Sequence, residues 1–471
     1  MTKYIEQLRL GDHKIRAIKT TFREVGLATF LTSLTTSVGF FTLTTASITP
    51  IREFGIYTGI GVFIAFIVAF TLLPSSLMLL PKPKISKKSV NASRWFGVLS
   101  RSFLLVLRYR KPVILINVLL IAGSLYGISQ IVINTYLIED LPSDDPLKEG
   151  FTFFDQNFGG SRPFEVSVEV KDTTLNIYSP EIIQEIEKVE SYMKSDFAAG
   201  NVASPVTLVK SMHQALNGGA NKAFSLPDSE RNWRRLDRYL NRILKRDDQN
   251  QVSTKDRRIG RITARVGDIG SSLSLQRTEE LKEFIAINTD IEKVSFVVTG
   301  TSNLIDKNNE YLAKNMFQGL GIAFGVVALI AGLMFKSVKM VFITLIPNII
   351  PLLIVAGVMG IFGVTLKLST SIIFTIAFGI AVDDTIHFIS KLKLELLKNK
   401  SLIYALKRTY LSTGKAIVVT SIILSGGFLI LILSSFGGTF YTGLLISLTL
   451  GLALVVDLTL LPVFVLLFYK R

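Results

Sequence analysis

The sequence predicts a polytopic membrane protein, a membrane all-α bundle of about eight transmembrane helices with one α+β domain outside the membrane. Three observations support this fold class. Of the 471 residues, 49% are hydrophobic, and the mean hydropathy is +0.45. The apolar residues gather into long runs that charged stretches separate. One long stretch, 135–314, instead has the mixed composition of a soluble domain.

Each of the long apolar runs could cross the hydrocarbon core of a bilayer, which takes about 20 residues of helix. These runs lie at roughly 25–46, 54–80, 111–134, 315–335, 339–362, 368–390, 414–434 and 440–469. The predicted organisation is a cytoplasmic loop at 1–24, two spans within 25–80, a basic linker at 81–110, one span at 111–134, an external domain at 135–314 and a five-span bundle at 315–469.

The net charge of +16 is concentrated in short loops that all fall on one side of the membrane when eight crossings are counted. The first such loop carries Lys82, Lys84, Lys87, Lys88, Arg94, Arg101, Arg108, Arg110 and Lys111 without an acidic residue. A second follows the sixth span, and the chain ends Lys470-Arg471. Because basic loops stay in the cytoplasm, we expect a bacterial inner-membrane protein with cytoplasmic termini and residues 135–314 in the periplasm. Its partners would be membrane lipids, not nucleic acid.

The basic linker has its own apolar pattern. Trp95, Leu99, Phe103 and Leu107 recur at helical spacing among basic residues, which predicts an amphipathic helix. Such a helix would either lie on the anionic cytoplasmic leaflet or pack beneath the bundle.

Regular structure is also predicted within 135–314. Alternating residues at 164–170 predict a strand, and 257–266 and 294–298 are further strand candidates. Helices are expected from Pro180, where proline suits a first turn, and at 272–287. This alternation favours a small α+β sandwich. Residues 215–255, rich in Asn, Arg and Lys, predict a mobile insertion.

The first two spans repeat the last two at a constant shift of 388 positions, as from Thr32 to Thr420. The shift also places Ser33 on Ser421, Gly39 on Gly427, Gly55 on Gly443 and residues 71–74 on 459–462. Apolar composition alone would give scattered Leu and Ile matches, not ungapped identities of this kind. Duplicated halves are typical of transporters, whose sites lie at the interface between repeats.

The sixth span contains two adjacent acids, Asp383 and Asp384. One Asp at the centre of a membrane helix costs about 2.5–3.5 kcal/mol, and adjacent side chains diverge by about 100° around a helix. Desolvation and mutual repulsion both favour protonation of at least one carboxylate, as a proton relay requires. The alternative is a structural ion pair, but the neighbouring spans carry no Lys or Arg near mid-membrane.

Other polar residues within the spans are weaker candidates. His387, one turn beyond the acids, either passes protons toward the cytoplasm or extends to the membrane interface. Thr420 and Ser421 either hydrogen-bond the carboxylates or serve helix packing. Asp457 is a further intramembrane acid, without a counterpart in the first repeat.

Two prolines, Pro347 and Pro351, lie inside the fifth span. They form either a hinge or a packing feature. No phosphate-binding loop, metal-ligand cluster or nucleophile elbow is visible, and the chain has three histidines and no cysteine. We therefore expect no enzyme, no metal and no cofactor beyond a proton gradient.

Together these motifs resemble the RND superfamily, and most closely its hydrophobe/amphiphile exporter branch, which includes the MMPL and hopanoid-exporter types. The resemblance rests on Gly379 followed by the acid pair, the five-span block behind an α+β domain, Pro347-Asn348-x-x-Pro351, the Thr-Leu-Leu-Pro ends of both repeats, and Asp144-Asp145-Pro146 through Phe158-Gly159-Gly160.

The resemblance implies twelve spans in two halves, a ferredoxin-like porter domain in each half, and export of lipid-like or amphiphilic, hydrophobic substrates by proton antiport. Asp383 and Asp384 would be the relay and Gly379 its motif glycine. The chain matches spans five to twelve, so we expect as partner the missing N-terminal half or a second copy. The alternatives are a SecDF-like protein-export accessory and a non-transporting, sterol-sensor-like membrane partner.

Overall fold

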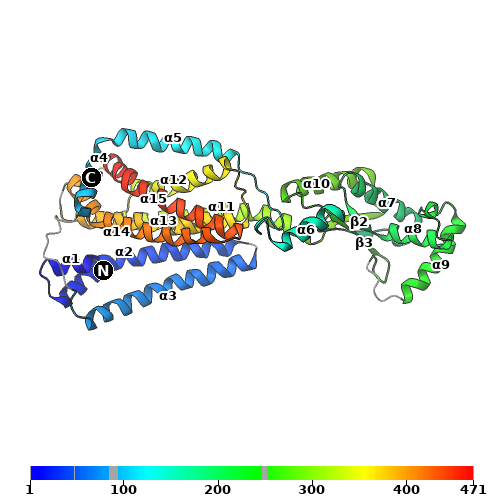
Figure 1. Ribbon diagram of the computed structural model, residues 1–471, viewed down its shortest axis with the longest axis horizontal. Helices are drawn as coiled ribbons and strands as arrows, with labels where there is room; N and C mark the ends of the chain where they lie inside the picture. Colours follow the sequence, from blue (N-terminus) through cyan, green and yellow to red (C-terminus); the bar gives the residue numbers. More distant parts are fainter. Residues whose placement is uncertain (1, 47, 84–93, 247–251, 400, 470–471) are drawn as a thin grey trace. The chain divides into compact units, whose positions relative to one another are not determined.

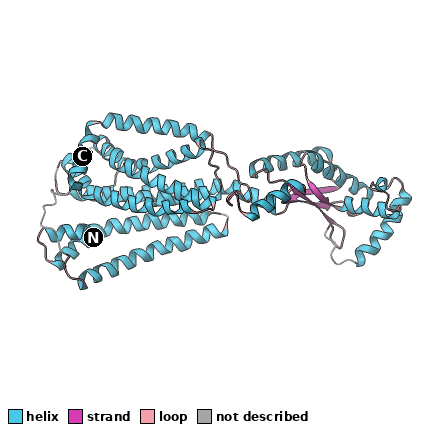
Figure 2. Cartoon of the chain, in the orientation of Figure 1, coloured by secondary structure: helices cyan, strands magenta, loops and turns pink. Residues whose placement is uncertain are grey.

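The computed structural model describes residues 2–46, 48–83, 94–246, 252–399 and 401–469. Contacts divide the chain into two compact units (Figures 1 and 2). The first, which we call the membrane unit, comprises Met1–Ile133 and Tyr311–Arg471. The second, which we call the sheet unit, comprises Asn134–Glu310.

In the described residues, 8 helices are long and apolar enough to cross a membrane, which confirms the predicted bundle. They are α2 (Lys14–Phe41, continued by η1, Thr42–Thr45), α3 (Thr49–Leu79), α5 (Arg110–Ser129), α11 (Thr301–Phe335), α12 (Val338–Ile361), α13 (Leu368–Leu396), α14 (Leu402–Leu429) and α15 (Gly437–Phe468). The chain is a multi-pass membrane protein.

Several helices start well before the predicted spans. Residues 14–24, predicted to belong to a cytoplasmic loop, form the first turns of α2, and Thr2–Arg9 form α1. Likewise, α14 starts at Leu402, ahead of the predicted residue 414. The loop prediction was wrong because hydropathy detects only the part of a helix that suits hydrocarbon. Lys, Arg and Thr continue a helix beyond that part at little cost.

The structure confirms the internal repeat. Helices α2 and α14 begin and end at the same shift of 388, and so do η1 and η4 (Ile430–Leu433). The two helices of each repeat, α2 with α3 and α14 with α15, also approach each other at equivalent positions. A Cβ at Gly55 would lie 2.6 Å from the Phe40 carbonyl oxygen, and one at Gly443 would lie 2.6 Å from that of Phe428. The repeat is therefore conserved at the level of backbone contacts.

Helices α5 and α12 pack through glycine. A Cβ at Gly357 would lie 2.5 Å from the Ser124 Cα, and one at Gly360 would overlap the Gly127 carbonyl group. Only backbone therefore fits between the two helices, a small-residue contact of the kind that membrane helices use for close approach.

We predict that Gly357→Leu will force α5 away from α12. Overpacking costs about 1–3 kcal/mol where side chains can adjust, and here the obstacle is backbone. Gly123→Leu is the matched control, because a Cβ at Gly123 meets nothing within 4 Å among the described residues. Thermal unfolding in detergent, followed by circular dichroism, should show a lower Tm for Gly357→Leu alone. Equal Tm values in the two variants would contradict this packing.

The amphipathic helix of the linker is α4 (Arg94–Arg108). Its residues Leu99 and Phe103 are buried in one cluster with residues of α13, α14 and α15, and Ser102 Oγ lies 2.9 Å from the Tyr410 hydroxyl. This arrangement corresponds to the second alternative, a helix packed against the bundle. The basic positions within 84–93, and Lys470-Arg471, lie outside the described residues.

The sheet unit is built on strands β1 (Arg162–Val170), β2 (Gly200–Ala203), β3 (Ile259–Val266) and β4 (Val294–Thr299). Their order is β2-β3-β1-β4, and every neighbouring pair is antiparallel (magenta in Figure 2). The helices of this unit are α6 (Pro146–Asn157), α7 (Pro180–Ser195), α8 (Pro205–Leu216), η3 (Asn221–Ala223), α9 (Glu230–Arg246) and α10 (Ser271–Asn288). The predicted strands and helices are thus present.

One face of the sheet forms the core of the sheet unit. Along β1, Phe164, Val166, Val168 and Val170 are buried, whereas Glu165 and Glu169 between them are not. This period-2 alternation is the pattern of a sheet covered on one face only. The buried side chains form one cluster with apolar residues of α7, α8, α9 and α10.

Part of the predicted mobile insertion is helical. Residues 230–246 form α9, whose Leu236 and Leu240, one turn apart, are buried in the core of the sheet unit. The prediction was wrong because it followed the composition, which Asn, Arg and Asp residues dominate. The two leucines alone are enough to pack the helix against the core. Residues 247–251 lie outside the described ranges.

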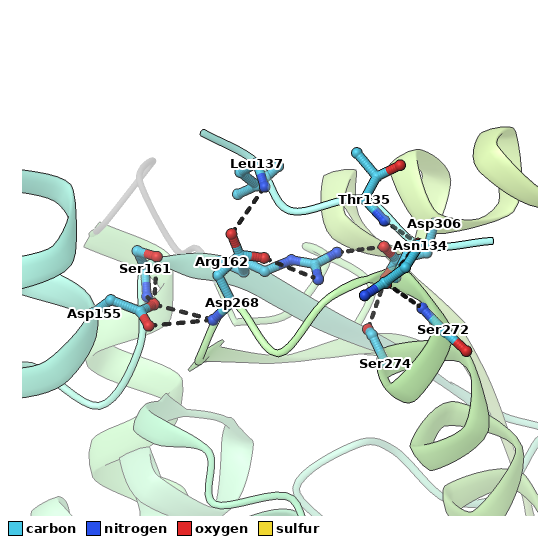
Figure 3. A network of polar contacts seen from close by, with 11 residues as sticks. Asn134, Thr135, Leu137, Asp155, Ser161, Arg162, Asp268, Ser272, Ser274 and Asp306 are labelled. Carbon is cyan, nitrogen blue, oxygen red and sulfur yellow. Dashed lines mark hydrogen bonds and ion pairs between the residues drawn. The ribbon is translucent and has the colours of Figure 1, made fainter. Parts of the chain in front are cut away.

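An arginine is buried among acids in the sheet unit (Figure 3). Arg162, at the start of β1, is 1% exposed, and its Nη2 lies 2.6 Å from Asp306 Oδ1. Its Nη1 lies 3.5 Å from Asp268 Oδ1. Ser274 Oγ donates to the second oxygen of Asp306 at 2.6 Å, and Leu137 N–H donates to Asp268 Oδ2 at 2.8 Å. The network joins β1, α10, α11 and the segment that leads in from α5.

Candidate proton-relay site

Asp384 is held by hydroxyl groups of α14. Ser421 Oγ donates a hydrogen bond of 2.7 Å to Asp384 Oδ2, and Thr420 Oγ1 donates one of 3.3 Å to Oδ1. Each hydroxyl also lies within hydrogen-bond distance of a carbonyl oxygen of its own helix, so its single proton is shared between that oxygen and the carboxylate. The contacts expected of Thr420 and Ser421 are therefore present, and their part in a relay stays a prediction.

Asp383 turns toward α2, as the ~100° step between adjacent helical residues requires. The Thr32 hydroxyl lies near this carboxylate and interacts with it electrostatically, while it donates its hydrogen bond of 3.0 Å to the Thr29 carbonyl oxygen of its own helix. His387 Nε2 lies 3.5 Å from Asp383 Oδ1, an ion-pair separation that is too long for a good hydrogen bond. Thr32 is the repeat counterpart of Thr420, so equivalent hydroxyl groups of the two repeats lie near the two carboxylates.

Gly379 lies where α13 and α2 approach each other closely. A Cβ at Gly39 of α2 would lie 3.1 Å from the Gly379 Cα, and Thr36 Oγ1 donates to the Gly379 carbonyl oxygen at 3.0 Å. The two backbones therefore approach closely just one turn before Asp383. The tighter position is Gly39, because a Cβ at Gly379 would lie 3.6 Å from the Gly39 Cα, an ordinary van der Waals distance.

A cavity of about 300 Å³ leads to the carboxylates between α1, α2, α13 and α14. Asp383, Asp384 and His387 line it together with Glu24 and Lys391. Glu24 Oε2 lies 3.4 Å from Lys391 Nζ. The cavity therefore has titratable side chains at successive turns of α13, from the acid pair through His387 to Lys391. Such an arrangement is expected of a path for protons or water.

Glu24 also pairs with α1, because its Oε2 lies 3.3 Å from Lys3 Nζ. Neither Glu24, Lys3 nor Lys391 was singled out from the sequence as part of the site. Lys391 follows the acid pair at helical spacing, which could have indicated its place, but nothing in the sequence links Glu24 to it.

Asp457 belongs to a separate hydrogen-bond chain. It is 1% exposed, and its Oδ1 accepts a hydrogen bond of 2.7 Å from Thr385 of α13. Asn348 Nδ2 in turn donates to Thr385 Oγ1 at 2.9 Å. The described residues that line the cavity do not include Asp457. The predicted acid thus joins α15, α13 and α12, and it lies within electrostatic reach of Asp384 without lining the cavity.

Pro347 and Pro351 are buried on either side of Asn348, and α12 continues as a helix through both. They free carbonyl oxygens within the membrane, while Asn348 holds α12 to α13 between them. A hinge at these prolines stays a prediction. Over the part of the chain that the structure describes, no group of three or more His, Cys, Asp or Glu side chains could hold a metal ion.

Comparison with known proteins decides the family. The model of the MMPL family matches residues 1–132 and 182–471. The chain belongs to the MMPL family. This confirms the resemblance to the RND superfamily, and proteins of this family are transporters rather than enzymes.

Two curated proteins are similar in sequence to this MMPL chain. A membrane protein of Methanocaldococcus jannaschii is 22% identical over 361 residues, which cover 75% of this chain and 90% of that protein. The apo-petrobactin exporter of Bacillus anthracis is 26% identical over 197 residues, which cover 38% of this chain and 26% of the exporter.

Two solved structures share the fold of this MMPL chain. SecDF, a translocon-associated membrane protein from Thermus thermophilus, has a TM-score of 0.56 and 15% identity, with 99% of this chain and 51% of SecDF covered. The hedgehog release protein Disp from the water bear Hypsibius dujardini has a TM-score of 0.62 and 13% identity, with 96% and 60% covered. The chain therefore spans between half and two thirds of the length of these two proteins.

Proposed function

We propose that this MMPL protein acts in a transporter that exports hydrophobic or amphiphilic molecules, driven by protons that bind Asp383 and Asp384. The observation that carries the proposal is the acid pair. Two carboxylates lie inside a membrane span, Asp384 bound by the Ser421 hydroxyl of one repeat and Asp383 near the Thr32 hydroxyl of the other. Both carboxylates line a cavity to which Glu24 and Lys391 also contribute. The similarity to a protein named as an exporter supports the direction of transport.

Protonation would change the contacts between helices. A charged carboxylate only accepts hydrogen bonds, whereas a protonated one also donates. Charged Asp384 suits the two donors Ser421 and Thr420; once protonated, its new O–H needs an acceptor. The proton therefore alters the relative stability of two arrangements of α13 and α14, which is the differential interaction that drives a conformational change.

His387 and the cavity would serve proton access. His387 lies between Asp383 and the pair formed by Glu24 and Lys391 along the cavity. Imidazole is the side chain whose charge changes most readily near neutral pH. In this proposal a proton passes between the cavity and Asp383 by way of His387, and no cofactor takes part.

The expected topology belongs to the same proposal. Both termini would be cytoplasmic in the inner membrane, as the basic loops indicate, and the sheet unit would lie in the periplasm. We further propose that this unit is ferredoxin-like. The order β2-β3-β1-β4, with α7 after β1 and α10 after β3, supports this.

A protein-export accessory remains the second candidate, because SecDF shares the fold. Disp shares the fold equally well, so the fold does not distinguish the two functions. The sequence similarity to an exporter favours export of small amphiphiles.

We predict that the wild-type chain in proteoliposomes will move a dansyl-labelled phospholipid when a pH gradient is imposed, and that a sodium gradient of equal size will not drive this movement. An ionophore that exchanges protons for potassium should stop the movement of the phospholipid within the dead time of the measurement. Movement that depends on sodium, or that survives collapse of the pH gradient, would contradict proton coupling.

A further inference from the structure

Helix α9 of the sheet unit carries its basic and its apolar residues on opposite sides. Because each helical residue turns about 100°, five arginines fall within an arc of about 100° and extend for about 16 Å along the axis. We call these five exposed residues the arginine stripe: Arg231, Arg234, Arg235, Arg238 and Arg242. On the other side of the helix, Leu236 and Leu240 are buried in the core of the sheet unit, and Trp233 packs against it.

Most of the charge on the arginine stripe is not neutralised. Among the residues that the structure describes, Arg234 is the one stripe residue with an acidic partner, Glu230. Their side chains are 75% and 78% exposed, and such an exposed pair contributes little to stability. Like charges one turn apart on a helix repel one another, so the stripe costs the fold some stability. A partner of opposite charge would offset this cost.

We propose that the arginine stripe is the docking surface for an acidic helix of another protein, with carboxylates spaced as the arginines are. All five basic residues between 230 and 242 are arginine, and none is lysine. The planar guanidinium group binds a carboxylate through two parallel hydrogen bonds, which the lysine ammonium group cannot do. Arginine is also enriched in protein interfaces, where lysine is depleted.

The two edges of the arginine stripe favour a protein over an anionic membrane. Glu230 and Asp237, both exposed, lie along one edge, where they would repel anionic lipid headgroups but could fix the orientation of a protein partner. Tyr239 lies along the other edge, 40% exposed and 5.9 Å from the Arg242 guanidinium carbon. Tyrosine and arginine are typical anchor residues of protein interfaces. The apolar side of α9, which a membrane-bound helix would insert into lipid, is buried in the core instead.

A designed peptide can test this surface on the full chain in nanodiscs of zwitterionic lipid. The probe is a fluorescent alanine-based helix with glutamates at i, i+3, i+4, i+7 and i+11, and its binding is followed by fluorescence anisotropy. We expect the peptide to bind the wild-type chain and to be released by salt, which screens exposed charges. Arg235→Gln combined with Arg238→Gln should weaken binding about tenfold. Unchanged tryptophan fluorescence will show that Trp233 keeps its place on the core.

Lys171→Gln combined with Arg265→Gln is the matched control. It removes the same charge from exposed positions of the sheet unit outside α9, and it should leave binding unchanged. A peptide with the same number of glutamates spread around the helix should bind the wild-type chain less tightly than the probe.

The proposal is overturned if the wild-type chain does not bind the probe, if the two double variants bind it equally, or if the spread peptide binds as tightly. It is also overturned if phosphatidylglycerol vesicles bind the stripe more tightly than the probe does, which would assign the stripe to a membrane. Association of the nanodiscs with one another that the stripe variant abolishes would instead assign it to a second copy. Since no transport is measured, the result is independent of the proposed function.

Discussion

The Arg162→Met variant is expected to lose about 3–5 kcal/mol of the folding free energy of the sheet unit, the typical cost of removing one partner from a buried ion pair. The guanidinium group is buried and lies within ion-pair distance of Asp306 and Asp268. Methionine fills much of the volume but leaves two carboxylates without their shared cation.

The loss of folding free energy in Arg162→Met should depend on pH. Burial raises the pKa of the Asp268 carboxyl above its usual value, and the Leu137 N–H and the Arg162 charge oppose this rise. Because the folded state holds this proton more tightly than the unfolded state, ionisation of Asp268 costs stability as pH rises from its ordinary pKa through the raised one. Without Arg162 the free-energy cost of ionising Asp268 in the folded state grows. The Arg162→Met variant should therefore lose less stability at acid pH than at neutral pH.

Trp233 makes the experiment specific, since it packs against the core of the sheet unit and the chain's other tryptophan is Trp95. In a Trp95→Phe background, urea unfolding followed by tryptophan fluorescence reports the sheet unit alone. Arg265→Met, at an exposed position on β3, should change stability little. Adding Asp306→Leu to Arg162→Met should restore part of the loss. Equal stability of the Arg162 and Arg265 variants would show that the network contributes nothing.

The sequence predicted the membrane helices well because hydrocarbon imposes a strong and local requirement on them. It also predicted the acid pair, since two adjacent carboxylates within an apolar run stand out. Arg162 could not be found in this way. It begins a strand where an exposed arginine would be ordinary, and Asp306 lies far along the chain, so only the fold shows that they meet.

Thr32 falls between these cases. Its place near Asp383 depends on the packing of α2 on α13, which the sequence does not reveal. The repeat nevertheless aligns it with Thr420, a predicted partner of the acids. Transferring that role across the repeat would have predicted Thr32. Glu24 has no such signal, because its partners Lys3 and Lys391 come from two other helices.

Asp383→Asn and Asp384→Asn are each expected to reduce transport driven by a pH gradient about 10²-fold or more, the lower end of what a positioned proton-transfer group contributes. Asparagine keeps the size of the side chain and one acceptor oxygen, so Asp384→Asn can still accept the hydrogen bond from Ser421. The change also removes a charge that costs about 2.5–3.5 kcal/mol within the membrane. The variants should therefore fold at least as well as the wild type, and their defect would report proton binding.

Asp457→Asn is the control that separates a relay from a general need for buried acid. It makes the same chemical change at another intramembrane carboxylate, one that Thr385 binds and that is not among the residues lining the described cavity. The Thr385 hydroxyl can donate to an amide oxygen equally well, so transport by this variant should stay near the wild-type rate. Proton uptake, measured with a pH-sensitive dye inside vesicles, should fall in the Asp383 and Asp384 variants and not in Asp457→Asn. An equal loss of transport in all three variants would mean that the acids support the structure of the bundle. Full transport by Asp383→Asn or Asp384→Asn would show that the replaced carboxylate is not a necessary proton carrier.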